Sequence, residues 1–119
     1  MPNWSTIEAS FLSLPHAQQL GELAASLARL NSWSQKSARE EVVPVLLSES
    51  LLYLSLLQRE SQINGELAQL LGLLQDCQQN WVDTWDNSTE IANIADIAST
   101  WSQRVLDMSG VLTSESMSA

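Results

Sequence analysis

The sequence predicts an all-α protein, an antiparallel helical bundle with four main helices plus a short N-terminal helix. Apolar residues recur at intervals of three and four along most of the chain, which is the spacing of one helical face. The alternation typical of strands is missing, and four glycines and three prolines leave few turn signals. Striped helices with short connections pack as antiparallel neighbours. We expect residues 1–110 to form one domain, followed by a polar, disordered tail over 111–119.

The first two helices are separated by a proline. Ser5 and Glu8 have the spacing of a capping box, in which each side chain bonds a free backbone N–H group, so the first helix is predicted to begin at Ser5. Pro15 ends this helix and fits the first turn of the next. Asn31 and Ser34 mark the end of the second helix. Its apolar stripe consists of His16, Leu20, Leu23, Leu27 and Leu30.

The third helix contains the most apolar part of the chain. A second capping box, Ser37 with Glu40, is predicted to open it. Pro44 must then kink or restart the helix, because proline lacks the N–H group of a helical hydrogen bond. Over residues 44–62 the only polar stripe is narrow and consists of Ser48, Ser55 and Arg59. A helix that is apolar nearly all round is central in a bundle or has a face that awaits a partner.

The last two helices are predicted from a break and a third capping box. Asn64 and the glycine after it indicate a break with Asn64 as the cap, although residues 44–86 could also form one long helix. Gly72 is expected to permit close approach of a neighbouring helix. The fourth stripe is Ile63, Leu67, Leu70, Leu74, Cys77 and Trp81. Asn87 and Glu90 form the third capping box, and Gly110 is the expected C-terminal cap. The fifth stripe is Ile91, Ile94, Ala98, Trp101, Val105 and Met108.

The charge of the chain bears on its partners and its location. Fourteen acidic and five basic residues give a net charge of −9, and the acidic excess is concentrated after Asp76. Such a surface disfavours direct binding of nucleic acids and anionic membranes, and suits a basic partner or solubility alone. The N-terminus has no basic, signal-peptide-like start, and the apolar run 42–57 is shorter than the about 20 residues of a membrane span. We expect a soluble, cytoplasmic protein.

Residues for catalysis, metals and cofactors are sparse. His16 is the only histidine and Cys77 the only cysteine, and they are far apart in the sequence. There is no Glu-x-x-His pair for a di-metal bundle site and no group of closely spaced glycines for a phosphate-binding loop. Cys77 has acidic and amide neighbours rather than the positive charge that activates a thiol. The sequence therefore predicts no enzyme, no metal and no cofactor.

Two alternatives to a plain binding function stay open. The segment HAQQLGELAAS, residues 16–26, is superficially similar to histidine phosphotransfer domains, which implies a phosphorelay through His16. In that family a lysine and a glycine follow the histidine closely. Here Gln19 and Leu20 stand where the lysine is sought, and Gly21 comes five residues after the histidine. The other alternative is an acidic decoy for a nucleic-acid-binding protein, based on the charge after Asp76.

A second resemblance concerns the source of the chain. The segments LLSESLLYLSLLQ (46–58) and WSQRVLDMSGVL (101–112), with the Trp-x-x-x-Trp motif between them, resemble small uncharacterised helical proteins of cyanobacteria. The resemblance implies a bacterial accessory protein and brings no functional residues with it.

The candidate contact residues are tryptophans at helix ends and leucines of the apolar third helix. Trp4, Trp81 and Trp101 extend apolar stripes and are predicted to belong to the core. Trp33 and Trp85 lie at or beyond helix ends, and exposed tryptophans are frequent binding hot spots. The predicted partner-binding residues are therefore Trp85, Asp83, Asp86, Trp33, Leu52 and Leu56. We interpret the chain as a non-catalytic protein–protein interaction module, an adaptor, regulator or assembly factor, whose partner is another protein or a second copy in a homodimer.

Overall fold

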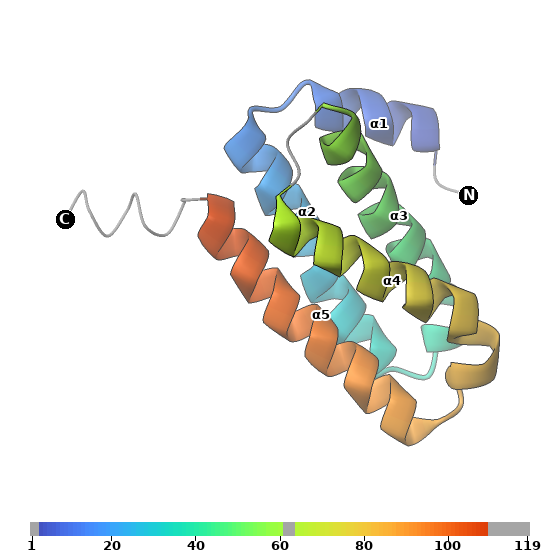
Figure 1. The fold of residues 1–119 in the computed structure, drawn as a ribbon. Helices are drawn as coiled ribbons and strands as arrows, with labels where there is room; N and C mark the ends of the chain where they lie inside the picture. Colours follow the sequence, from blue (N-terminus) through green and yellow to red (C-terminus); the bar gives the residue numbers. More distant parts are fainter. Residues whose placement is uncertain (1–2, 61–63, 110–119) are drawn as a thin grey trace.

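The computed structural model describes residues 3–60 and 64–109, which form five α-helices (Figure 1). Their bounds are α1 Trp4–Leu12, α2 His16–Ser34, α3 Arg39–Arg59, α4 Gly65–Thr84 and α5 Ser88–Ser109. The predicted all-α bundle with one short N-terminal helix is confirmed. Residues 44–86 form two helices rather than one. The predictions for Ile63, Gly110 and the tail 111–119 fall outside the described residues.

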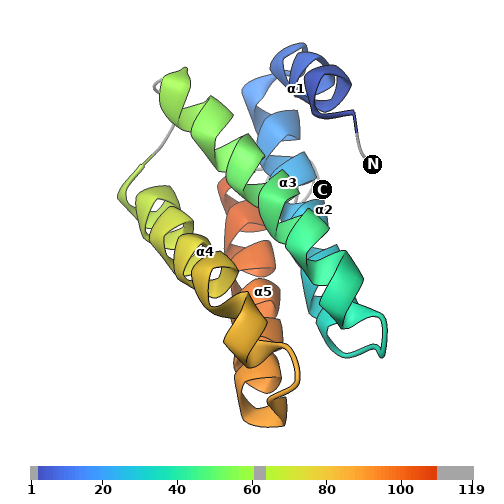
Figure 2. The ribbon, with the colours of Figure 1, turned by 90° about the vertical axis from the view of Figure 1, so that its right-hand side faces the viewer.

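The four long helices run alternately in opposite directions, and α1 lies across one end of the bundle (Figures 1 and 2). Helix α2 packs closely against α5 and against α3, so the first and last long helices are neighbours. Helix α4 packs mainly against α3 and touches α5 less. One side of α4 is therefore only partly covered.

The core consists mainly of residues from the predicted apolar stripes, although His16 is exposed and Cys77 and Met108 are only half-buried. Each long helix contributes several side chains that are at most 7% exposed, and burying one such leucine contributes about 1.5–3 kcal/mol. The buried stripe residues are Leu20, Leu23, Leu27 and Leu30 of α2, Leu67, Leu70, Leu74 and Trp81 of α4, and Ile91, Ile94, Ala98, Trp101 and Val105 of α5. Helix α3 adds Val43, Leu46, Leu47, Tyr53, Leu54, Leu56 and Leu57.

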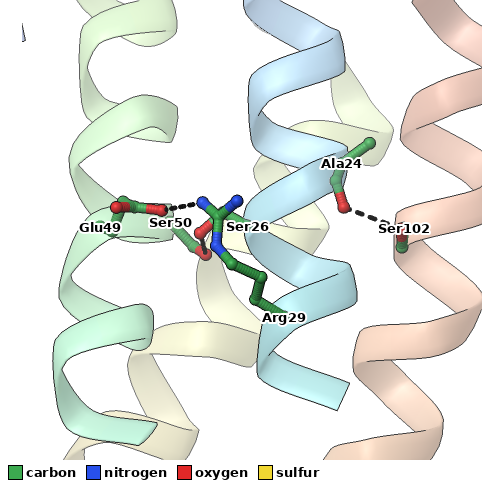
Figure 3. Close-up of polar contacts among 6 residues, drawn as sticks. All are labelled: Ala24, Ser26, Arg29, Glu49, Ser50 and Ser102. Carbon is green, nitrogen blue, oxygen red and sulfur yellow. Dashed lines mark hydrogen bonds and ion pairs between the residues drawn. The ribbon is translucent and has the colours of Figure 1, made fainter. Parts of the chain in front are cut away.

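Polar contacts fix α2 against both of its long neighbours (Figure 3). The hydroxyl groups of Ser26 and Ser50 lie 2.9 Å apart between α2 and α3, and both serines are fully buried. On the other side of α2, the hydroxyl of Ser102 in α5 donates to the carbonyl oxygen of Ala24 at 2.8 Å. Small side chains at these positions allow the helix backbones to come close.

Asparagine caps three of the helices. The Asn3 side chain accepts a hydrogen bond from the Thr6 N–H at 3.1 Å, so α1 begins one residue before the predicted Ser5. Asn64 accepts from the N–H three residues later, which confirms the predicted break. The Asn87 side chain accepts hydrogen bonds from the N–H groups of Thr89 and Glu90 at the start of α5. Asn is as good a cap as Ser, and the residue just outside the helix takes the role.

The start of α3 differs from the predicted capping box. Its N-cap is Ala38, whose side chain cannot accept a hydrogen bond, so Ser37 does not cap this helix. The turn before it is held by backbone bonds instead: the Lys36 N–H donates to the Trp33 carbonyl and the Arg39 N–H to the Lys36 carbonyl. A chain that continues from α2 to α3 through successive turns does not need a side-chain cap.

Helix α3 runs through Pro44 without restarting. Proline leaves the carbonyl group four residues earlier, that of Glu40, without its helical donor. The indole N–H of Trp81 in α4 donates to this oxygen at 3.3 Å. The donor that proline removes is therefore replaced from the neighbouring helix, and the bond also fixes α4 against α3.

The prediction for Gly72 is wrong. A side chain added at Gly72 would meet no atom within 4 Å, because this residue faces solvent on α4. No neighbouring helix requires a glycine there.

Candidate functional site

Trp33 and Trp85 lie at the same end of the bundle, at the end of α2 and just after α4 (Figure 1). Both indoles are half-buried and pack against the core. The Trp85 carbonyl accepts a hydrogen bond from Nε of Arg39 at 2.7 Å, and Nζ of Lys36 lies 4.4 Å from the ring centroid of Trp33. Packing against the core covers part of each indole, and Lys36 covers part of the Trp33 ring. Only the remaining exposed part of each indole is available to a partner.

The two aspartates beside Trp85 are exposed. Neither Asp83 nor Asp86 takes part in an ion pair with the other residues that the structure describes. They form an acidic rim at this end of α4, without a cavity of their own.

The other tryptophans divide differently from the prediction. Trp81 and Trp101 are buried, at 6% and 4% exposed, as predicted. Trp4 is half-buried and is not part of the hydrophobic core, so its assignment to the core is corrected. It is the first residue of α1, where the helix extends past the end of the bundle.

The two leucines predicted as contact residues on α3 have different environments. Leu56 is only 2% exposed and belongs to the core, so its assignment to a partner surface is corrected. Leu52 is one turn earlier and only about 40° away around the helix, yet it is half-buried and lines a depression between α3 and α4. Of the two residues, only Leu52 can meet a partner without rearrangement of the core.

Leu52 lines a shallow depression of about 360 Å³ between α3 and α4. The Nε2 atom of Gln78 donates to the hydroxyl oxygen of Ser48 at 3.2 Å, which joins the two helices near one end of the depression. Its lining consists of Ser48, Leu51, Leu52, Ser55, Gln58, Leu71, Gln75 and Gln78.

Two exposed valines continue the walls of this depression. Val45 is three residues before Ser48 on α3, and Val82 is four residues after Gln78 on α4, so each extends its wall by one turn. Because the helices are antiparallel, both valines lie at the end marked by the Gln78–Ser48 bond. Val45 is 38% and Val82 80% exposed, and they are the large apolar side chains with the greatest exposure among the described residues. We call these two valines and the eight lining residues the α3–α4 face.

The α3–α4 face contains no charged residue, although the chain carries a net charge of −9. Asp76 and Asp83 of α4 project roughly 110–130° away from it around the helix, from the rotation of 100° per residue. On α3 the nearest charges along the same stripe are Glu41 at one end and Arg59 at the other. The face is therefore a neutral, partly apolar strip with one charge of each sign at its two ends.

Sequence reasoning identified Leu52 as a contact residue of this face and missed all four residues on the α4 side. The missed residues are Leu71, Gln75, Gln78 and Val82. Their spacing of four, three and four residues, without any charge, is visible in the sequence. This second stripe is less conspicuous because two of its four residues are glutamines, whereas the core stripe of the same helix is almost entirely apolar.

The reactive side chains do not gather. His16 is exposed at the first position of α2. Cys77 is half-buried on α4, and burial together with Asp76 and Glu90 raises the pKa of its thiol, which disfavours the nucleophilic thiolate. In the parts of the chain that the structure describes, no three His, Cys, Asp or Glu side chains are arranged to hold a metal ion.

Two further hollows lie away from the α3–α4 face. One, of about 480 Å³, lies between α2 and α5, with Arg39, Asp96 and Ile91 in its wall. The other, of about 360 Å³, lies beside α1 and contains Tyr53, whose ring stacks on Phe11 with centroids 4.4 Å apart. Burial and the nearby Glu49 and Glu22 carboxylates raise the pKa of Tyr53 to about 12, so this phenol stays neutral.

Comparisons with models of protein families, with curated proteins and with solved structures gave no match to this chain. Across residues 3–60 and 64–109, none of the helices has the length and apolar character that crossing a membrane requires.

Proposed function

We propose that this chain is a non-catalytic protein-binding module, an adaptor, regulator or assembly factor of the bacterial cytoplasm, and that the α3–α4 face is its contact surface. The observation that carries the proposal is the exposure of Val45 and Val82, with the half-buried Leu52, along one uncharged strip. Apolar side chains that are contiguous on a surface favour association, because a partner removes them from water.

The chemistry of the strip also favours a protein as the partner. Its glutamines and serines can each donate and accept hydrogen bonds, as the polar groups of protein interfaces do. The depression is shallow and lacks a buried polar group that would orient a small ligand. A helix or a helical pair from another protein matches its elongated shape.

Two alternative functions remain predictions. A phosphorelay would use His16, and an acidic decoy would use Asp83, Asp86 and the other late acidic residues. No contact in the described part of the chain favours either function over protein binding through the α3–α4 face.

A capture experiment with a matched pair of variants tests the proposal. Gln75 and Gln69 are both exposed on α4 and lie about 120° apart around the helix, but only Gln75 belongs to the face. The wild-type chain, Gln75→Glu, Val82→Glu and Gln69→Glu are used as bait in extracts of the source cells. We expect the wild-type and Gln69→Glu baits to retain the same proteins, and the two face variants to lose them. Equal capture by all four chains, each shown by circular dichroism to be folded, would refute the proposal.

A further inference from the structure

The outer stripe of α3 has a sequence symmetry that points to a second copy of the chain. From Glu41 to Arg59 this stripe advances by steps of 4, 3, 4, 3 and 4 residues, which is the spacing of a coiled-coil seam. Its members are Glu41, Val45, Ser48, Leu52, Ser55 and Arg59. When this series is laid against itself in the opposite direction, Ser48 meets Leu52, Val45 meets Ser55, and Glu41 meets Arg59.

We propose that α3 of one copy lies antiparallel along α3 of a second copy, in the depression of the α3–α4 face, and forms a symmetric dimer. The proposal rests on the proposed function and names its partner. A twofold axis near the middle of α3 relates the copies, so each contact occurs twice. Leu52 of each copy then lies near the axis, and the opposite charges lie at the two ends.

Charge selects this face among the surfaces of the molecule. Two chains of net charge −9 repel each other, and most outer surfaces present unpaired carboxylates to a second copy. Asp76 and Asp83 are exposed on the outer side of α4, and Asp96 and Asp107 on α5. On the α3–α4 face the antiparallel register places each Glu41 beside Arg59 of the second copy, so the carboxylates of Glu41 and Glu8 would share one guanidinium instead of meeting unpaired.

The two charges are available for this contact. Glu41 is exposed and has no ion pair with another described residue. Arg59 bonds Glu8 of α1 at 2.8 Å, yet its side chain is 59% exposed, so its other N–H groups can reach a second carboxylate. Glu41 and Arg59 are separated by 18 helical residues, or about 27 Å, which sets the length of the contact.

The size of the contact predicts a weak dimer. A strip about 27 Å long and two helices wide covers on the order of 500 Å² on each copy, below the about 800 Å² per partner of a standard interface. Ser48 and Ser55 also make the seam less apolar than a stable coiled coil. We therefore expect dissociation in the micromolar range or above, with rapid exchange.

Charge reversal gives the decisive test, with sedimentation velocity measured from micromolar to millimolar concentration. Glu41→Arg places two arginines together at both ends of the dimer, and Arg59→Glu does the same with two glutamates. We expect each variant to dimerise about tenfold more weakly than wild type, and Glu41→Arg/Arg59→Glu to restore the wild-type affinity. Gln69→Glu is the control, because this side chain lies on α4 outside the face and its dimerisation should match wild type. Glu8→Gln frees Arg59 from its bond within the chain, so it should dimerise at least as tightly as wild type.

The outcomes separate this inference from the proposed function. A chain that stays monomeric at millimolar concentration, or a dimer that neither reversal weakens, overturns the proposed dimer. If capture of another protein is still lost in Val82→Glu, the binding function of the face stands while the second copy is rejected as its occupant. If the double reversal fails to restore dimerisation while both single variants are folded and weakened, the antiparallel register is wrong and the inference falls.

Discussion

The buried hydroxyl pair between α2 and α3 allows a quantitative test of how the bundle is held together. Ser26 and Ser50 are both 0% exposed, and their oxygens are 2.9 Å apart (Figure 3). Replacing one serine with alanine leaves the other hydroxyl buried without this partner, which costs roughly 1.5 kcal/mol. Alanine is the better helix former by about 0.5 kcal/mol, so each single variant should lose about 1 kcal/mol of stability.

The double variant Ser26→Ala/Ser50→Ala removes both hydroxyls and leaves no unpaired group. The lost hydrogen bond and the gain in helix propensity then nearly cancel, so we expect a stability within about 0.5 kcal/mol of wild type. Urea unfolding followed by tryptophan fluorescence measures all four chains of the cycle. The two single losses should exceed the double loss by about 2 kcal/mol. A double variant that loses the sum of the single effects would show that the hydroxyls act independently, and would refute this account of the pair.

Other contacts give predictions of the same kind. Trp81→Phe should cost about 1–3 kcal/mol, because the Glu40 carbonyl loses its indole donor; equal urea midpoints for the variant and wild type would contradict the role of this bond. Gly72→Ala should stabilise the chain by about 0.5–1 kcal/mol in thermal unfolding, because the added methyl group meets open space on a helix; destabilisation would indicate a close contact there. Ultraviolet titration of Tyr53, the only tyrosine, should show ionisation near pH 12 instead of 10, and the tyrosine's contribution to stability should persist below pH 10 and decline as the pH rises through 12; a midpoint near 10 would contradict its burial. Alkylation of Cys77 should be slower in the folded than in the unfolded chain at mildly alkaline pH, since burial raises the thiol pKa; equal rates would count against a half-buried thiol.

The sequence predicted the helices well because burial dominates their placement. The leucines of α2 and the mixed apolar stripe of α5 recur at helical intervals, and each predicted leucine of α2 is buried. The break at Asn64 was also predicted correctly, since asparagine before glycine combines a cap with a flexible position.

The helix ends were harder to predict because several residues compete for each cap. Ser5 and Asn3 are both suitable, and the choice is worth a few tenths of a kcal/mol, less than the packing of Phe11 that fixes the angle of α1. At α3 the competing factor is the short turn itself. There the Arg39 N–H, one of the donors that Ser37 could have capped, bonds the Lys36 carbonyl instead.

The candidate site shows a different limit of sequence reasoning. Helical spacing places Leu52 and Leu56 one turn apart on the same part of α3, but only tertiary structure reveals that Leu56 is buried while Leu52 is half-exposed. The exposure of Val82 likewise depends on the position of α4 at the edge of the bundle. A stripe in the sequence shows that a face exists, and the neighbours of the helix decide whether that face is covered.

The serines of the outer α3 stripe limit how strongly this face can associate. Leucine at both Ser48 and Ser55 would complete a continuous apolar seam from Val45 to Leu52 and beyond, and each would add about 1.5–3 kcal/mol of burial in an association. Such a seam would favour permanent association and would expose a large apolar strip in the free chain. Hydroxyl groups keep the strip hydrated when the chain is alone and still permit close contact when it is covered. For a reversible contact with a second copy, weak apolar groups at the centre and opposite charges at the ends set the register while keeping dissociation fast.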